Sequence, residues 1–280
     1  MALQTTIPPA PWKVIRVPET SSTNELVLTK FNNQPWCCAI ADIQTQGHGR
    51  RGREWLSPAG GLWMSATLPP APQNTNFCTL TMVSALSVLR AMKKWCSDFH
   101  RPIENSNDNI RSDISEAIDC LGIKWPNDII DHRNRKIAGI IAKTWFEGSV
   151  PGPIVIGIGI NISNSIPDCL KATAYSLSHL FETPVPNSQI MSLANFILPE
   201  LKNDYNQLCS KSFTVFKNEM SSQCLTIGRQ ISIIGPNGSK THGYAVDIDD
   251  QGRLEVQNPD KSHTFLDSGE ISIRNYDSSI

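Results

Sequence analysis

The sequence predicts an α+β protein in which a mixed β-sheet is flanked by helices and followed by a small C-terminal β-barrel. Three apolar segments, at residues 120–125, 136–146 and 154–162, follow one another as strands of one sheet. Residues 77–95 repeat apolar side chains at helical spacing, which predicts a core helix. After residue 225 the pattern changes to short strands joined by turns, which is typical of a small barrel.

Local patterns predict the other elements of the larger part. Residues 12–17, 37–42 and 61–68 are predicted strands, and Ser22 and Glu25 have the capping-box spacing that begins a helix. Residues 193–208 and 213–220 are helical in pattern, although Pro199 is expected to start, end or kink a helix. Residues 101–116 contain few large apolar side chains and are predicted to form a surface insert.

The change of pattern predicts two domains, at residues 1–224 and 225–280. Barrel strands are expected at 230–234, 243–248, 253–256, 263–266 and 270–274, with turns at 235–238, 249–252 and 258–260. A chain of 280 residues is long enough for one large domain and one small one.

Composition argues against several classes of protein. The 25 basic and 26 acidic residues give a net charge of −1, which disfavours a general nucleic-acid or anionic-lipid binder. The sequence shows neither a signal peptide nor an apolar run of bilayer length, so we expect a cytoplasmic protein without membrane contact. The eight cysteines form no C-x-x-C pair, and we expect them to be reduced rather than to form disulfides or a metal site.

A loop rich in glycine and arginine follows the strand at 37–42. Residues 47–52 satisfy G-x-G-x-x-G, but no helix is predicted after them and no acid lies about 20 positions on, so a dinucleotide fingerprint is rejected. The glycines allow close approach of the backbone to a ligand, and the guanidinium groups of Arg50, Arg51 and Arg53 suit phosphate. The loop is therefore interpreted as an anion clamp, with a solvated basic turn as the alternative.

Lys124 ends an apolar strand beside Trp125 and before Pro126. A lysine that closes a buried strand is costly unless it meets an anion. The alternative is a lysine whose ammonium group reaches solvent at the sheet edge.

Taken together, five motifs resemble those of biotin protein ligases. They are residues 22–24 (STN), 44–58 (QTQGHGRRGREWLSP), 124–128 (KWPND), 136–141 (KIAGII) and 157–161 (GIGIN), in that family's order and spacing. Residues 248–255 and 269–272 resemble its small SH3-like C-terminal domain. The resemblance implies a catalytic domain similar to class II synthetases. It also implies a reaction in which biotin and ATP give biotinyl-5′-AMP and pyrophosphate, before biotin passes to one lysine of a biotin carboxyl carrier domain.

The resemblance also implies roles for individual residues. Lys124 would bridge the biotin carboxylate and the α-phosphate, and Arg50 would act with it in catalysis. The expected biotin site comprises Ser22, Thr23, Asn24, Gln44, Gly47, His48, Gly49, Arg50, Lys124, Trp125, Gly139, Gly157 and Gly159. The expected nucleotide site comprises Arg50, Arg53, Trp55, Lys124, Asn127 and Asn161. Trp125 would wall the biotin tail and Trp55 would stack on adenine. Mg²⁺ would arrive with ATP rather than occupy a fixed protein site.

Alternative functions remain open at this point. A lipoate or octanoate ligase would share the fold, although Gln44 and the arginine-rich loop favour biotin. A biotin-sensing repressor would need a winged-helix domain, and only 21 residues precede the first predicted helix, so we expect no DNA binding by that route. A non-catalytic adenylate-binding protein would not need Lys124. A homodimer is left open, and His48 stands where the family usually has Arg or Lys.

Overall fold

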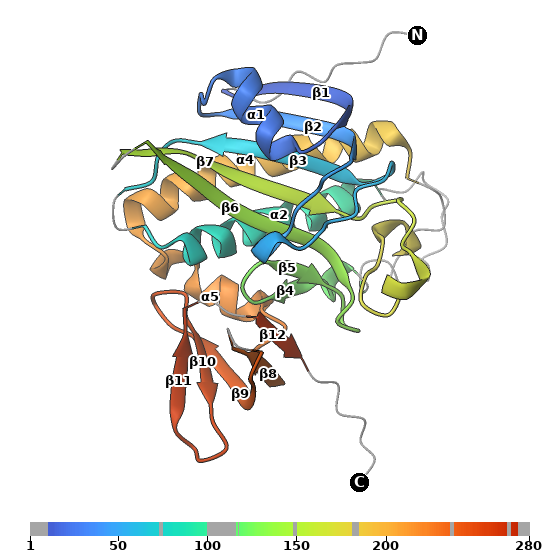
Figure 1. The fold of residues 1–280 in the computed structure, drawn as a ribbon. Helices are drawn as coiled ribbons and strands as arrows, with labels where there is room; N and C mark the ends of the chain where they lie inside the picture. Colours follow the sequence, from blue (N-terminus) through green and yellow to red (C-terminus); the bar gives the residue numbers. More distant parts are fainter. Residues whose placement is uncertain are drawn as a thin grey trace.

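A seven-stranded mixed sheet forms the centre of the larger part of the molecule (Figure 1). The computed structural model describes residues 11–72, 75–99, 116, 118–147, 150–180, 185–235, 238–267 and 270–273. The strands of this sheet are β1 (Lys13–Thr20), β2 (Cys37–Gln44), β3 (Leu62–Leu68), β4 (Gly122–Lys124), β5 (Asp128–Ile130), β6 (Lys136–Glu147) and β7 (Val150–Ile160). Their spatial order is β1-β2-β3-β7-β6-β5-β4.

The sheet is mixed because its first two strands are parallel. A parallel pair needs a crossover, and α1 (Thr23–Phe31) supplies it between β1 and β2. All other neighbours in the sheet are antiparallel. The long β6–β7 pair lies in the middle and places Gly139 opposite Gly159.

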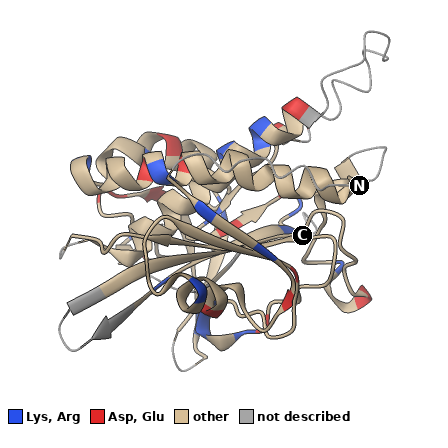
Figure 2. Ribbon diagram, turned by 90° about the horizontal axis from the view of Figure 1, so that it is seen from above, with Lys and Arg blue, Asp and Glu red and all other residues tan. Residues whose placement is uncertain are grey.

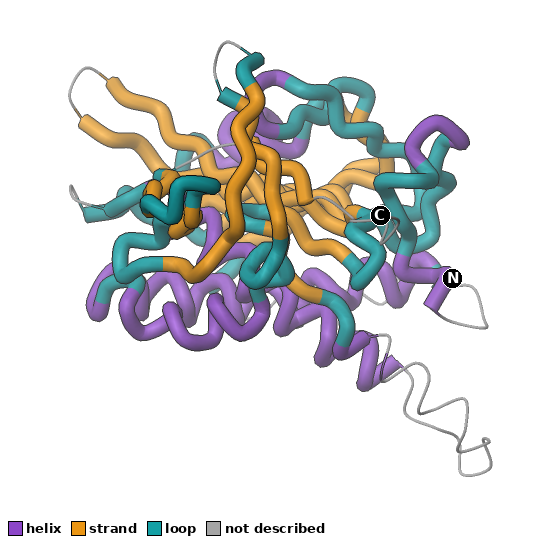
Figure 3. The backbone as a smooth tube through the Cα atoms, turned by 90° about the horizontal axis from the view of Figure 1, so that it is seen from below, coloured by secondary structure: helices purple, strands orange, loops and turns teal. Residues whose placement is uncertain are grey.

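Helices cover the two faces of the sheet unequally. On one face α2 (Phe77–Phe99) and α4 (Asn187–Lys211) lie side by side, and alternate strand residues such as Cys38 and Ile40 join them in the main core (Figure 3). On the other face α1 covers a smaller cluster that contains Cys37, Ala39 and Val155. The helix α1 is short, so much of this second face is left for loops, and the cavity described below lies there.

The C-terminal part forms a separate five-stranded antiparallel sheet. The helix α5 (Thr214–Gln223) leads into β8 (Gln230–Ile234), β9 (Lys240–Ile248), β10 (Leu254–Gln257), β11 (His263–Leu266) and β12 (Glu270–Ile273). The strand order is β11-β10-β9-β8-β12, so the last strand returns to pair with the first (Figure 1). The α+β class with a small SH3-like C-terminal domain is confirmed, whereas the boundary at residue 225 stays a prediction.

Three local predictions were wrong. Pro199 neither starts nor ends a helix, because α4 continues through it and the buried stripe from Ile190 to Leu208 outweighs the one hydrogen bond that proline removes. The sequence predicts a turn over residues 127–134, between the strands at 120–125 and 136–146, but this segment contains β5, a strand too short to leave a periodic signal. The Ser22 side chain makes no capping hydrogen bond; instead the backbone N–H of Thr23 donates to Gln44 Oε1 at 2.9 Å.

Other expectations concern surface features. Most of the predicted insert, residues 101–115, lies outside the described residues. All eight cysteines are free; the sequence predicts them to be core residues, but Cys169 is exposed. Figure 2 shows Lys and Arg interspersed with Asp and Glu over the helices. No helix in the described part of the chain has the length and apolar character needed to cross a membrane.

Candidate active site

A cavity of about 620 Å³ lies on the face of the main sheet that α1 covers only in part. Its walls are the loop after β2, the 124–128 turn, the first half of β6, the end of β7, and the segment from 161 to 174. The predicted site residues that line it are Thr23, Asn24, Gln44, His48, Gly49, Arg50, Arg53, Trp55, Lys124, Trp125, Asn127, Gly139, Gly157, Gly159 and Asn161. Ser22 and Gly47 do not line it. Ser22 is buried at the start of α1, and Gly47 packs against the backbone of Trp55.

One end of the cavity is a closed network of polar side chains. Gln44 Oε1 accepts from both the backbone N–H and the hydroxyl of Thr23, each at 2.9 Å. The Thr23 hydroxyl lies 2.7 Å from Ser65 Oγ, which donates to Asn24 Oδ1 at 2.9 Å. Thr23, Asn24 and Ser65 are all buried. Buried polar groups held in this way present donors and acceptors at defined positions, which suits a small polar ring.

Glycines form the floor of the cavity where a side chain would not fit. A Cβ on Gly157 would lie 2.8 Å from Asn24 Oδ1. A Cβ on Gly159 would lie 2.5 Å from Trp55 Nε1, because the indole of Trp55 rests directly on this strand. The Trp55 Nε1 is buried without a hydrogen-bond partner. The floor therefore accepts flat or apolar groups against bare backbone.

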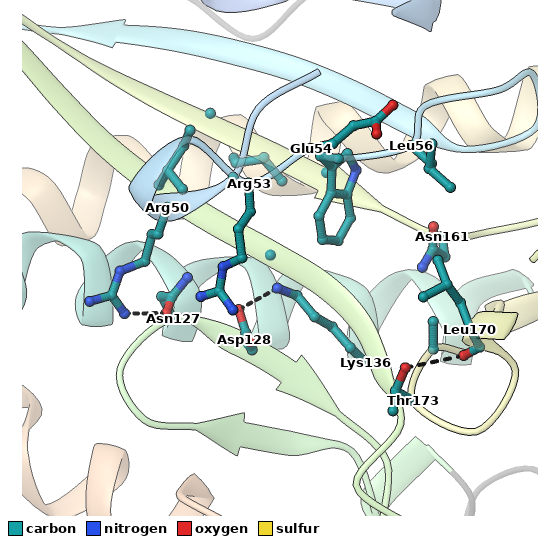
Figure 4. A pocket seen from close by; sticks show the side chains of 18 of the residues that line it. Arg50, Arg53, Glu54, Leu56, Asn127, Asp128, Lys136, Asn161, Leu170 and Thr173 are labelled. Carbon is teal, nitrogen blue, oxygen red and sulfur yellow. Dashed lines mark hydrogen bonds and ion pairs between the residues drawn. The ribbon is translucent and has the colours of Figure 1, made fainter. Parts of the chain in front are cut away.

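The loop between β2 and β3 forms a narrow hairpin over the cavity. The Gly49 N–H donates to Arg53 O at 2.7 Å and the Trp55 N–H to Gly47 O at 2.8 Å. The tip reverses through two left-handed residues, Arg51 at φ 57° and Gly52 at φ 71°. Such a conformation costs about 1–2 kcal/mol for a residue other than glycine. The tight tip directs the Arg50 and Arg53 side chains toward the 127–128 turn (Figure 4).

Cationic side chains gather at the centre of the cavity. Arg50 Nη1 donates to Asn127 Oδ1 at 2.8 Å, and Lys136 Nζ lies 2.7 Å from Asp128 Oδ1 (Figure 4). The Lys136 ammonium also lies 4.8 Å from the centre of the Trp55 ring. Burial lowers the pKa of the Arg50 guanidinium, and the Cys78 thiol and Asp128 carboxylate oppose that shift. Because arginine stays charged at any working pH, this group of cations can neutralise a developing negative charge.

Lys136 and Asp128 were missed as site residues by the sequence analysis. Both belong to motifs that were noticed, KIAGII and KWPND, but the roles assigned there went to Lys124, Trp125, Asn127 and Gly139. The sequence offered the same evidence for both lysines, because Lys124 ends one strand and Lys136 begins another. Only the pairing of β5 with β6 shows that the two strands bring Asp128 and Lys136 together.

Comparisons with known proteins agree with this geometry. Residues 13–161 match the biotin/lipoate A/B protein ligase family, over more than half of the chain. The chain belongs to the biotin/lipoate A/B protein ligase family. Residues 226–274 match the biotin protein ligase C-terminal domain. A biotin protein ligase from Aquifex aeolicus, solved with biotin and ATP, matches with a TM-score of 0.74 and 26% identity, over 94% of this chain and 98% of its own.

Relatives within the ligase family differ in length. The bifunctional ligase/repressor BirA of Bacillus subtilis is 31% identical over 81% of this chain, which spans 63% of that relative. The biotin–[acetyl-CoA-carboxylase] ligase of Paracoccus denitrificans is 28% identical over 86% of this chain and 92% of its own length. The expectation that this ligase-family chain does not bind DNA stays a prediction.

Proposed function

We propose that this protein is an ATP-dependent biotin protein ligase. It would join biotin to ATP, release pyrophosphate to leave biotinyl-5′-AMP, and transfer biotin to one lysine of a biotin carboxyl carrier domain. The observation that carries the proposal is the union, in one cavity, of the polar network around Gln44 with the cations around Arg50. Two similar proteins support it: the Paracoccus relative, which is named a biotin–[acetyl-CoA-carboxylase] ligase, and the Aquifex biotin protein ligase solved with biotin and ATP.

The polar network favours biotin over lipoate. The ureido ring of biotin carries two N–H donors and a carbonyl, which can pair with Thr23, Asn24 and Gln44. A dithiolane ring offers no such groups and would leave the remaining donors and acceptors of these buried side chains without a partner on the substrate. A site built to hydrogen-bond its substrate discriminates strongly against an analogue that lacks the groups. The apolar ring and tail would then lie along the floor beside Gly157 and against the Trp55 indole that covers Gly159.

The cations would serve the adenylation step. A biotin carboxylate that attacks the α-phosphate brings two anions together, and Arg50, Lys124 and Lys136 all line the cavity where this would occur. Arg53 would hold the phosphates as charge passes to pyrophosphate. The nucleotide would extend toward Asn161 and the segment from 164 to 174, which form the other end of the cavity. Whether Trp55 stacks on adenine stays a prediction.

Mg²⁺ fits this site as a companion of the nucleotide. Among the described residues no group of three or more His, Cys, Asp or Glu could hold a metal ion alone. Mg²⁺ is commonly held by one or two carboxylates together with substrate phosphates, and Asp128 supplies a carboxylate in the cavity. The ion would neutralise phosphate charge during adenylation.

The second step needs no enzyme nucleophile. The amine of the carrier lysine would attack the biotinyl carbonyl of the mixed anhydride directly, forming an amide as the acyl–phosphate bond breaks and AMP leaves. The hairpin from 47 to 55 would exclude water until then. We also propose a carrier domain as the acceptor of biotin and a cytoplasmic location, where ATP is available. A homodimer is a further proposal.

A mass-spectrometric assay tests the proposed function. The protein is incubated with ATP, Mg²⁺, a carrier domain and either biotin or lipoate. The expected result is a carrier that gains one biotinyl group at a single lysine and no lipoyl group. Lipoyl transfer at a comparable rate would overturn the assignment of biotin.

The glycine floor provides a test of the biotin pose. Gly157→Ala should raise the Kd for biotin at least tenfold, about 1.4 kcal/mol, because its methyl group would collide with the Asn24 amide. Isothermal titration measures the change. Gly152→Ala is the matched control in the same strand, outside the cavity lining, and should leave the Kd unchanged. Equal affinities in the two variants would contradict the pose.

A further inference from the structure

Trp125 connects the cavity wall to the C-terminal sheet through two buried hydrogen bonds. Its backbone N–H donates to Thr226 Oγ1 at 3.0 Å, and its indole N–H donates to Gly252 O at 3.2 Å. Trp125 is 2% exposed and Thr226 is completely buried. The indole N–H of Trp125 is therefore bound to the turn between β9 and β10, although Trp125 also lines the cavity.

The turn that accepts the indole N–H is held firmly in place. Gly252 has a φ of +79°, and a Cβ there would lie 2.7 Å from Thr79 Cγ2, because the turn is pressed against α2. Asp249 Oδ1 accepts from the backbone N–H groups of Gln251 and Arg253, at 2.9 and 2.8 Å. The Gly252 carbonyl is thus a rigid acceptor rather than part of a mobile loop.

From Trp125 the connection continues to the cations through Asn127. Asn127 Nδ2 donates to Ile140 O at 2.9 Å, and the Ile140 N–H donates to Asn127 O at 3.0 Å. The Asn127 N–H donates to Lys124 O at 3.2 Å, which closes the turn. The remaining side-chain oxygen, Oδ1, accepts from Arg50 Nη1. The turn that carries Lys124 is thus anchored to β6 on one side and to the C-terminal sheet on the other.

We propose that Trp125 is a positioning residue through which the C-terminal domain sets the geometry of Arg50 and Lys124 for adenylation. The inference rests on the proposed function. The hydrogen bonds of Thr23, Gln44 and Ser65 run among these residues and to Asn24 and Ser57, on a different part of the cavity wall from this connection. Loss of the indole hydrogen bond should therefore slow adenylation while biotin affinity is retained. If Trp125 instead walls the biotin tail, biotin affinity should fall.

The test compares two interdomain hydrogen bonds of similar length. Trp125→Phe removes the indole N–H and keeps an aromatic ring in place. Ser221→Ala removes the bond from Ser221 Oγ to Asp247 Oδ1, 2.9 Å, which joins α5 to β9 away from the turn. Biotin-dependent ATP–pyrophosphate exchange gives kcat and the KM for each substrate, and titration gives the Kd for biotin.

The expected result is a fall of about tenfold in kcat for exchange in Trp125→Phe, with the biotin Kd within twofold of the parent. Ser221→Ala should remain within twofold in every parameter. Asn127→Ala should show the same split between kcat and biotin Kd. The double variant Trp125→Phe/Asn127→Ala should be no slower than Asn127→Ala alone, because both changes act on one connection.

Three outcomes would overturn the inference: a kcat of Trp125→Phe equal to that of Ser221→Ala, additive losses in the double variant, or a weakened biotin Kd with normal kcat. If Trp125→Phe does not fold, Thr226→Val, which removes only a hydroxyl, replaces it in the same comparison. Failure of the parent protein to form biotinyl-5′-AMP would instead overturn the proposed function, so the two failures are distinguishable.

Discussion

Lys136→Ala should lower the rate of biotinyl-5′-AMP formation by about 10²–10³-fold, the loss typical when one preorganised charge partner is removed from a transition state. Lys136 begins β6, and its ammonium lies 2.7 Å from Asp128 Oδ1 and 4.8 Å from the centre of the Trp55 ring. Contacts with Asp128 and Trp55 hold the Lys136 ammonium in the cavity before substrate binds. Alanine keeps the strand and removes only the charge and its stem, so folding should be preserved.

Lys171→Ala is the matched control for Lys136→Ala. Lys171 lies in the segment from 164 to 174, but its side chain is 66% exposed, pairs with Asp168 and does not line the cavity. ATP–pyrophosphate exchange should be unchanged in this variant, and circular dichroism should show both proteins folded. Exchange in Lys136→Ala within threefold of the parent would remove Lys136 from the adenylation step and leave Lys124 as the candidate for the bridging charge.

Asp204→Ala should have the largest effect on stability, a loss of about 3 kcal/mol in the free energy of unfolding. The Asp204 carboxylate is completely buried between α2 and α4, where it accepts from Ser87 Oγ at 2.6 Å and pairs with Arg90. Removing it leaves a hydroxyl and a guanidinium without their shared acceptor. The loss should lie at the lower end of the range for buried pairs, because Arg90 is one-third exposed and lies near Glu200 and Glu219.

Urea denaturation of Asp204→Ala beside Glu200→Ala tests this reasoning. Glu200 is a partly exposed partner of the same arginine, 3.8 Å away, and its loss should cost less than about 1 kcal/mol. Activity per folded molecule should be the same in both variants, since neither residue lines the cavity. Similar stabilities for the two variants would show that the buried pair contributes little net stabilisation.

The fold was predictable wherever one segment carries its own pattern. The strand that contains Ile154, and the helix that contains Leu86, are apolar enough along their own length to be recognised. The continuous α4 was not, because Pro199 is a strong local signal and the burial that overrides it comes from α2, distant in the sequence. Tertiary packing decided that case, and local propensity could not.

The site was predictable where a motif identifies the residues that form it. Thr23, Gln44 and Arg50 were expected in one site and line one cavity. Motifs do not show which way a side chain points. The indole N–H of Trp125 binds the carbonyl of Gly252, 127 residues away, and no spacing rule within the KWPND motif could have revealed that bond.

The place of β12 in the structure has a consequence for synthesis of the protein. Ile271, in this strand, is paired with Ile233 of β8 and also lines the cavity. When the residues of the seven-stranded sheet have emerged from the ribosome, the nascent chain still lacks the Gly252 carbonyl and the Ile271 side chain. Since domains generally fold as they emerge, N-terminal part first, the binding cavity is completed only after residue 271 has left the exit tunnel. The complete cavity therefore forms only after β12 has been synthesised, and chains that stop before residue 271 lack part of its wall.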